Sequence, residues 1–181
     1  MKNSVKRLIK GTRLEPVARK LWDFVQPPSP SALADRRDNA HTIDIMSRIL
    51  KENSNCIDVG SHEGDILAEM LRLSPLGYHY AFEPIPYMAN LIKKRFQKLK
   101  NCDVRPVALS DEDAELSFHH VTNYPALSGL KQRNYDNSKA KIELIKVKTQ
   151  RLDDVLPREL KIHFMKVDVE GAELQVFRGG I

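Results

Sequence analysis

The chain has 181 residues and a formal net charge of +5; 41% of its residues are apolar and 29% are charged. This balance is typical of one soluble globular domain and excludes a largely disordered chain. No apolar run approaches the roughly 18 residues that a membrane-spanning helix needs. Two cysteines, Cys56 and Cys102, are too few for a disulfide framework or a cysteine-rich zinc site, so we expect a cytoplasmic protein with reduced thiols.

The positive charge is concentrated at the N-terminus. Residues 1–20 carry a net charge of +6, and the rest of the chain sums to −1. No continuous apolar core follows the basic start, so we expect no signal peptide. Apolar residues at helical spacing predict a basic helical arm of one or two amphipathic helices that ends at the proline-rich residues 27–30. We expect this arm to pack on the main domain; the alternative is weak contact with an anionic membrane surface.

Strand and helix patterns alternate along the rest of the chain. The expected strands cover residues 55–59, 78–82, 104–109, 115–121, 142–149 and 162–167. The expected helices cover residues 42–50, 65–73, 87–99 and 172–177. Such repeats imply an α/β fold with a parallel sheet and helices on both faces, in which 115–121 and 142–149 form an inserted antiparallel pair. We expect an N-terminal arm and lead-in helix over residues 1–54 and the α/β domain over residues 55–181.

The first expected strand runs into a glycine-rich turn with the pattern D-x-G-x-x-x-G. Its residues are Asp58, Val59, Gly60, Ser61, His62, Glu63 and Gly64. Gly60 allows a sharp turn, and Gly64 allows a ligand to approach the next helix. An acid before the glycines suits a ligand that carries an ammonium or sulfonium group rather than a diphosphate. A purely structural glycine turn is the alternative.

The next two strands also end in residues that could hold a nucleoside. Glu83 lies 19 residues beyond Gly64, close to the roughly 20 expected for an acid that binds ribose hydroxyls. Ala108 and Leu109 could flank an adenine ring, and Ser110 or Asp111 could bind its edge. The alternatives are that Glu83 is only a charge at the end of a strand and that Asp111 belongs to an ordinary turn.

Three acids gather around a glycine after the last expected strand. The string runs from Phe164 to Glu173 and contains Asp168, Glu170 and Glu173. Clustered carboxylates at the end of a strand are costly unless they hold a cation, hydroxyls or protons. We therefore assign Asp168 and Glu170 a functional role. Glu173 is expected to stabilise the N-terminus of the following helix.

Taken in order, these motifs resemble the FkbM family of S-adenosylmethionine-dependent methyltransferases. The resemblance rests on D-V-G-x-x-x-G, A-F-E-P-x-P, V-A-L-S-D, L-D-D and K-V-D-V-E-G-A-E with F-R-G-G, between residues 55 and 180. It implies the class I methyltransferase (Rossmann-like) fold, S-adenosylmethionine as cofactor, and O-methylation of a hydroxyl on a sugar, glycolipid or natural product. No nucleic-acid partner is expected. Enzymes that act on nucleic acids usually spread positive charge over a face, whereas the positive charge of this chain is concentrated in residues 1–20.

The resemblance also implies positions for the cofactor. Asp58, Gly60 and Gly64 would frame its methionine part, Glu83 would hold the ribose, and Asp111 would lie near the adenine. Ser61, His62, Pro84, Leu109 and Ser110 complete the expected cofactor-binding set. The family often has Asn where this chain has His62.

A complete fold of this class has seven main strands, whereas the sequence supplies the first four and the inserted pair. We therefore expect a C-terminally incomplete domain whose fourth parallel strand has an unpaired edge. Residues 123–130 are expected to form a loop over the acceptor site; a plain surface connection is the alternative. No metal site is expected, because no His, Cys or Asp spacing specifies one.

For catalysis, the resemblance and the acidic string together favour Asp168 or Glu170 as the base that deprotonates the acceptor, with His62 as the other candidate. Two further functions stay open. A nicotinamide-dependent oxidoreductase would share the acid after the second strand but needs G-x-G-x-x-G, which is absent. A non-catalytic remnant would use its arm to bind a membrane or a protein.

Overall fold

A computed structural model describes residues 30–131 and 140–180 of the chain. The N-terminal amphipathic helices expected from the sequence lie outside these described residues. The chain separates into two compact units, Met1–Thr42 and Ile43–Ile181. The division expected after residue 54 stays a prediction. None of the described helices is both long and apolar enough to span a bilayer.

The first described helix, α3 (Pro30–Ile49), is longer than the helix expected over residues 42–50. A proline is tolerated at the start of a helix, where its missing N–H has no intrahelical partner. The side chains at 36–41 are exposed, so apolar periodicity could not reveal this part of the helix. Within the larger unit, the end of α3 packs into an apolar cluster formed by Ile43, Met46, Leu50, Cys56, Ile66, Met70, Leu73 and Phe164.

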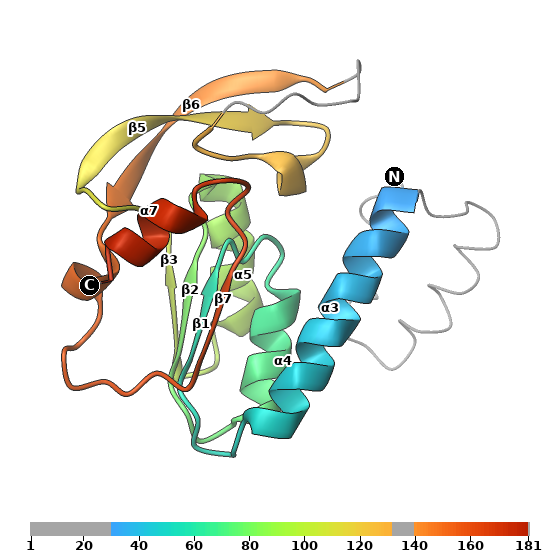
Figure 1. Cartoon of the computed structure of the whole chain (residues 1–181), viewed down its shortest axis with the longest axis vertical. Coiled ribbons are helices and arrows are strands. Elements are labelled where there is room, and N and C mark those ends of the chain that lie inside the picture. Colours follow the sequence, from blue (N-terminus) through green and yellow to red (C-terminus); the bar gives the residue numbers. More distant parts are fainter. Residues whose placement is uncertain (1–29, 132–139, 181) are drawn as a thin grey trace. The chain divides into compact units, whose positions relative to one another are not determined.

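Four parallel strands form the main sheet, in the order β3-β2-β1-β7 (Figure 1). They are β1 (Cys56–Val59), β2 (His79–Phe82), β3 (Cys102–Arg105) and β7 (Phe164–Val167). Every residue of β1 and β2 is buried, as is usual for strands covered on both faces. Among the described residues β7 pairs only with β1, so the expected unpaired edge at the fourth strand is confirmed.

Helices cover both faces of this sheet. On one face lie α4 (Asp65–Leu73) and α5 (Pro86–Phe96), which contribute Leu67, Leu71 and Ile92 to an apolar cluster. On the other face lie α6 (Leu152–Val155) and α7 (Glu173–Arg178), which contribute Val155 and Val176 to a second cluster. The parallel sheet covered on both faces that was expected for a Rossmann-like fold is therefore confirmed.

A second sheet has the order β4-β6-β5 and contains the inserted pair. Its strands are β4 (Ala108–Leu109), β5 (Ala114–Val121) and β6 (Ile142–Gln150), and a short 3-10 helix, η1 (Pro125–Leu127), follows β5. β5 and β6 are antiparallel, as expected. The single strand expected over residues 104–109 is wrong: it divides into β3 and β4 at Pro106, which has no N–H to continue a ladder.

Candidate cofactor-binding site

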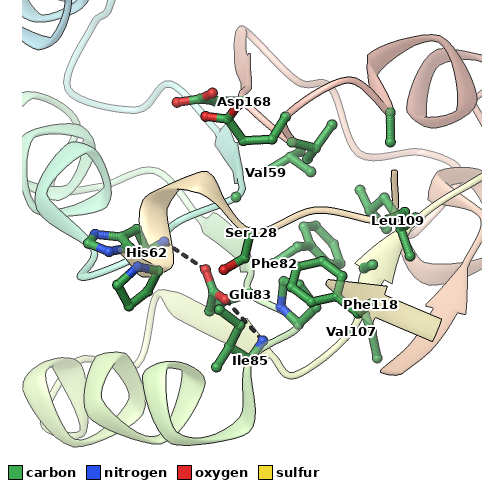
Figure 2. A pocket seen from close by; sticks show the side chains of 18 of the residues that line it. Val59, His62, Phe82, Glu83, Ile85, Val107, Leu109, Phe118, Ser128 and Asp168 are labelled. Atoms are coloured by element: carbon green, nitrogen blue, oxygen red, sulfur yellow. Dashed lines mark hydrogen bonds between the residues drawn. The ribbon is translucent and has the colours of Figure 1, made fainter. Parts of the chain in front are cut away.

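A pocket of about 550 Å³, including space open to solvent, lies at the carboxyl ends of β1, β2 and β7. Parallel strands place these ends at the same edge of a sheet, where ligands of open α/β folds bind. The residues expected from the sequence that line the pocket are Gly60, His62, Glu83, Pro84, Ala108, Leu109, Asp168 and Glu170. Figure 2 labels His62, Glu83, Leu109 and Asp168 among them.

Gly60 forms the sharp turn after β1. Its φ is +77°, a conformation that side chains disfavour. A Cβ atom at this position would overlap the backbone carbonyl oxygen of Asp168. The Gly60 N–H donates to the Phe82 carbonyl at 3.0 Å, so the turn is tied to β2 as well. The glycine therefore allows the ends of three strands to meet.

Gly64 has a different environment from the one expected. It does not line the pocket, and a Cβ there would lie 3.1 Å from Phe96 Cε2 and 3.2 Å from Ile92 Cγ2. The close neighbour at Gly64 in this structure is therefore helix α5. A contact between Gly64 and a ligand stays a prediction.

Two residues that are not glycine adopt positive φ values at the pocket. His62 has a φ of 48° and Glu170 has a φ of 58°. Such conformations are uncommon outside glycine, Asn, Asp and His, and they gather where the surrounding structure imposes them. Both residues lie in turns that follow a strand of the main sheet and line the pocket. The unusual backbone conformation at Glu170 therefore lies in the lining of the candidate site.

Glu83 is held rigidly at the pocket, with only 4% of its surface exposed. Its Oε2 accepts the His62 N–H at 2.8 Å, and its Oε1 accepts the Ile85 N–H at 3.0 Å (Figure 2). Burial raises the pKa of Glu83 to about 7, although both N–H donors act in the opposite direction. Each carboxylate oxygen can accept more than one hydrogen bond, so Glu83 can still receive hydroxyl donors from a ligand.

An apolar wall faces this carboxylate. It is formed by Val107 and Leu109, around β4, together with Phe118 of β5 (Figure 2). Phe118 also packs with Ile85 and Met88 in an apolar cluster. Sequence reasoning missed Phe118 as a pocket residue. The alternation of β5 predicted a buried face, but only the placement of the hairpin shows that this face meets the pocket.

The connection after β5 lines the pocket through Pro125, Ala126, Ser128 and Leu130. The Ser128 hydroxyl accepts the Val121 N–H at 2.9 Å, which ties the connection back to β5. Gly129 comes close to the turn after β7, because a Cβ on it would lie 3.2 Å from the Glu170 carbonyl oxygen. These four residues bring part of the segment 123–130 to the pocket. That this segment forms a loop over an acceptor site stays a prediction.

A cluster of three charged side chains joins the turn after β1 to the end of β7. Lys166 Nζ lies 3.2 Å from Asp168 Oδ2 and 3.7 Å from Asp58 Oδ1, and it donates to the Gly60 carbonyl at 3.3 Å. Burial raises the pKa of Asp58, and Lys166 is the strongest of the neighbours that lower it. Sequence reasoning missed Lys166; its position two residues before Asp168 in a strand was the available signal.

Five of the expected cofactor-binding residues do not line the pocket: Asp58, Ser61, Gly64, Ser110 and Asp111. The Ser61 hydroxyl donates to the Asp58 carbonyl at 2.8 Å. Ser110 is buried, and a Cβ on Gly179 would overlap its carbonyl oxygen, so the end of α7 covers it. The break at Pro106 carries β4 into the second sheet, and Ser110 and Asp111 follow it there.

Glu173 accepts the Gly171 N–H through Oε1 at 3.0 Å, at the start of α7. This contact agrees with the expected role at the helix start. In the described part of the chain, no three or more His, Cys, Asp or Glu side chains are grouped so that they could hold a metal ion.

Comparison with protein families identifies the same region. The model of the methyltransferase FkbM domain matches residues 58–181. The 2-O-methyltransferase NoeI of Sinorhizobium fredii (strain NBRC 101917 / NGR234) is 25% identical over 191 residues, which cover 97% of this chain and 76% of that protein. Methyltransferase 1 of Beauveria bassiana (strain ARSEF 2860) is 26% identical over 146 residues, which cover 71% of this chain. The match spans 59% of Methyltransferase 1, less than two thirds of its length.

Solved structures align over a smaller part of the chain. An rRNA methylase from Streptococcus thermophilus has a TM-score of 0.35 and 18% identity over 38% of each chain. The precorrin-6y C5,15-methyltransferase of Geobacter metallireducens GS-15 has a TM-score of 0.32 and 23% identity, over 37% of this chain and 36% of its own.

Proposed function

Because the chain belongs to the FkbM methyltransferase family, we propose that it binds S-adenosylmethionine at the carboxyl ends of β1, β2 and β7 and methylates a hydroxyl oxygen. The family match implies use of this cofactor. Binding by this chain, the hydroxyl acceptor and the residue roles below are proposals. The acceptor class is a sugar, glycolipid or other small natural product, in line with the name of the 2-O-methyltransferase relative.

The burial of the Glu83 carboxyl group at the pocket is the observation that supports this proposal most directly. A carboxylate buried at a pocket is costly unless it accepts hydrogen bonds or a proton. Glu83 already accepts two backbone N–H groups, yet its pKa is raised to about 7. The two hydroxyls of a ribose would supply further donors to the same oxygens, and the apolar wall of Val107, Leu109 and Phe118 fits an adenine ring. The residues present therefore fit an adenosine cofactor.

S-adenosylmethionine, when bound, supplies an electrophilic methyl group on a positively charged sulfur. The contribution of the chain is to align an acceptor oxygen with that methyl group and to remove its proton. We assign proton removal or acceptor orientation to Asp168, which lies at the pocket, with Glu170 beside it in the next turn. His62, which also lines the pocket, is the alternative base.

Titration calorimetry with S-adenosylhomocysteine tests the binding proposal. We expect micromolar affinity, and we expect Glu83→Ala to weaken binding by about 1–3 kcal/mol, because ribose hydroxyls would lose their acceptor. Glu115→Ala is the matched control, since Glu115 is exposed on β5 away from the pocket lining. Binding of NAD instead would favour an oxidoreductase, and a folded chain that binds neither ligand would favour a non-catalytic module.

The catalytic assignment is tested by single-turnover methyl transfer once an acceptor has been found by screening hydroxylated compounds. Asp168→Asn is expected to lower the rate by about 10²–10⁴-fold, the range for a lost general base, with a much smaller change in cofactor affinity. Full activity of Asp168→Asn would refute the base role. An equal fall in affinity and rate would reassign Asp168 to cofactor binding.

A further inference from the structure

We infer that Lys166 is a positioning residue of this site, whose ammonium group joins the buried carboxylate of Asp58, the Gly60 turn and the side chain of Asp168. This inference rests on the proposed function, because it concerns how the cofactor pocket keeps its shape. The motif K-V-D-V-E-G-A-E begins with Lys166, but the sequence analysis assigns no role to this residue.

Strand register places these residues on one face. Asp58 of β1 is the parallel partner of Lys166 of β7, and Asp168 follows two residues after Lys166. Side chains two residues apart in an extended chain point to the same side. The ammonium group therefore lies between both carboxylates, 3.7 Å from Asp58 Oδ1 and 3.2 Å from Asp168 Oδ2.

Asp58 depends on this ammonium group. The residue is fully buried. Among the groups that favour its ionised form, Lys166 has the largest effect, ahead of the Ser61 hydroxyl and the Leu67 N–H. A buried charge without a partner is strongly unfavourable, and removing one member of a buried ion pair leaves the other uncompensated. Lys166 has only 18% of its side chain exposed, so its attraction to Asp58 is weakly screened.

Lys166 also acts on the part of the cluster that reaches the pocket. Its hydrogen bond to the Gly60 carbonyl and its ion pair with Asp168 connect two segments that both line the pocket. One ammonium group between two carboxylates leaves one negative charge when all three are ionised, which suits a ligand with one positively charged sulfur. Without Lys166, two carboxylates would repel each other beside the Gly60 turn.

The test compares Lys166→Met with Lys161→Met. Both variants lose one positive charge, but Lys161 is exposed in the segment before β7. Circular dichroism first establishes that each variant is folded at pH 8. Calorimetry with S-adenosylhomocysteine is then expected to show at least a tenfold loss of affinity in Lys166→Met and less than a twofold change in Lys161→Met.

A pH profile distinguishes this role from ordinary packing. The charged groups that act on Asp58 are Lys166 and Asp168 of β7, and Glu83 at the end of β2. Loss of Lys166 raises the pKa of Asp58 further above its ordinary value of 3.8, so the stability of the variant falls as pH rises above that value. In urea titrations, Lys166→Met should therefore lose more stability relative to wild type at pH 8 than at pH 5. Adding Asp58→Asn should remove most of this difference between the two pH values; Glu83, whose pKa Lys166 also lowers, accounts for the remainder.

The outcomes separate the inference from the proposed function. Wild-type binding with unchanged affinity in Lys166→Met, or equal losses in both lysine variants, would overturn the role of Lys166 alone. A loss of stability in Lys166→Met that does not depend on pH would also overturn it, because the Asp58 partnership would then be absent. A folded wild type that does not bind S-adenosylhomocysteine would overturn the proposed function and this inference with it. If Lys166→Met is not folded at pH 8, refolding at pH 5 supports the inference, and failure at both values contradicts it.

Discussion

The position of Glu83 follows from the local sequence, but its hydrogen bonds and its pKa depend on the tertiary structure around it. It follows β2 directly, and its two oxygens accept N–H groups from His62, 21 residues earlier, and from Ile85, two residues later. These bonds keep the carboxyl group at the pocket, while burial raises its pKa to about 7. The charge of Glu83 therefore changes near neutral pH.

The first prediction concerns this ionisation. In the unfolded chain Glu83 ionises near 4.5, and in the folded protein near 7, so the folded state loses stability as pH rises between these values. Glu83→Gln cannot ionise, but its amide oxygen can accept only one of the two backbone N–H groups, a loss that is the same at both pH values. Relative to wild type, the variant should therefore be more stable at pH 8 than at pH 5, by up to about 3 kcal/mol. Urea unfolding at both values measures the difference. An equal change at both would show that Glu83 does not titrate in this range.

The second prediction concerns Gly60. Gly60→Ala combines a positive φ with overlap of the Asp168 carbonyl oxygen, so we expect a loss of about 3 kcal/mol or more in the free energy of unfolding. Gly171→Ala is the matched control: its φ is +100°, but no atom lies within 4 Å of the added Cβ. The control should lose only about 1–2 kcal/mol from backbone strain. Equal losses in urea titrations would indicate that the approach of β7 does not matter.

Among the elements, the hairpin of β5 and β6 determines the shape of the pocket. It brings Phe118 to the apolar wall, and the connection after β5 reaches the turn after β7 at Gly129. The main sheet alone would leave the carboxyl ends of β1 and β2 open on this side. The inserted pair of strands therefore contributes to the candidate site.

The third prediction tests how this connection is held. Ser128→Ala removes the acceptor of the buried Val121 N–H, which should cost about 1–3 kcal/mol in unfolding free energy and weaken S-adenosylhomocysteine binding by a few-fold. Ser117→Ala is the control, because this exposed hydroxyl on β5 accepts a hydrogen bond from the exposed Lys146 side chain at 3.2 Å and from no buried N–H of the described residues. Chemical denaturation and calorimetry on both variants measure the effect. A change no larger than that of the control would mean that the Ser128 bond does not hold the connection.

For the whole molecule, the residues of the pocket come from one continuous part of the chain, between Val59 and Ala172. The basic charge lies mainly in residues 1–20, which the structure does not describe. The basic N-terminal segment and the pocket residues are therefore separate in sequence.

The fourth prediction follows from that separation. Removal of residues 1–27 should leave S-adenosylhomocysteine affinity within about threefold, because no pocket residue is lost. A threefold change in affinity corresponds to about 0.65 kcal/mol of binding free energy. Calorimetry on the shortened and full chains, with folding checked by circular dichroism, gives the comparison. A tenfold loss in a folded, shortened chain would place part of the arm at the pocket.

Local patterns in the sequence were sufficient for much of the architecture. Alternating strands and helices predicted the covered parallel sheet, and residues at the ends of its strands predicted Gly60, Glu83 and Asp168 as neighbours at one pocket. This works because parallel strands must present their carboxyl ends at the same edge, so position along each strand is enough. Helix α3 was longer than expected because the exposed side chains at residues 36–41 form no apolar stripe that would reveal it.

Other features depended on tertiary structure. The ion pairs of Lys166 require the register of β1 against β7, two strands about 108 residues apart, and Phe118 reaches the pocket only through the placement of the hairpin. The break at Pro106, which carries β4 into the second sheet, takes Ser110 and Asp111 away from the pocket lining. Sequence periodicity specifies which face of an element is apolar, but it contains no information about which distant element that face will meet. Register and sheet-to-sheet packing decided these contacts, because they are set by the combined burial of many side chains and not by any one segment.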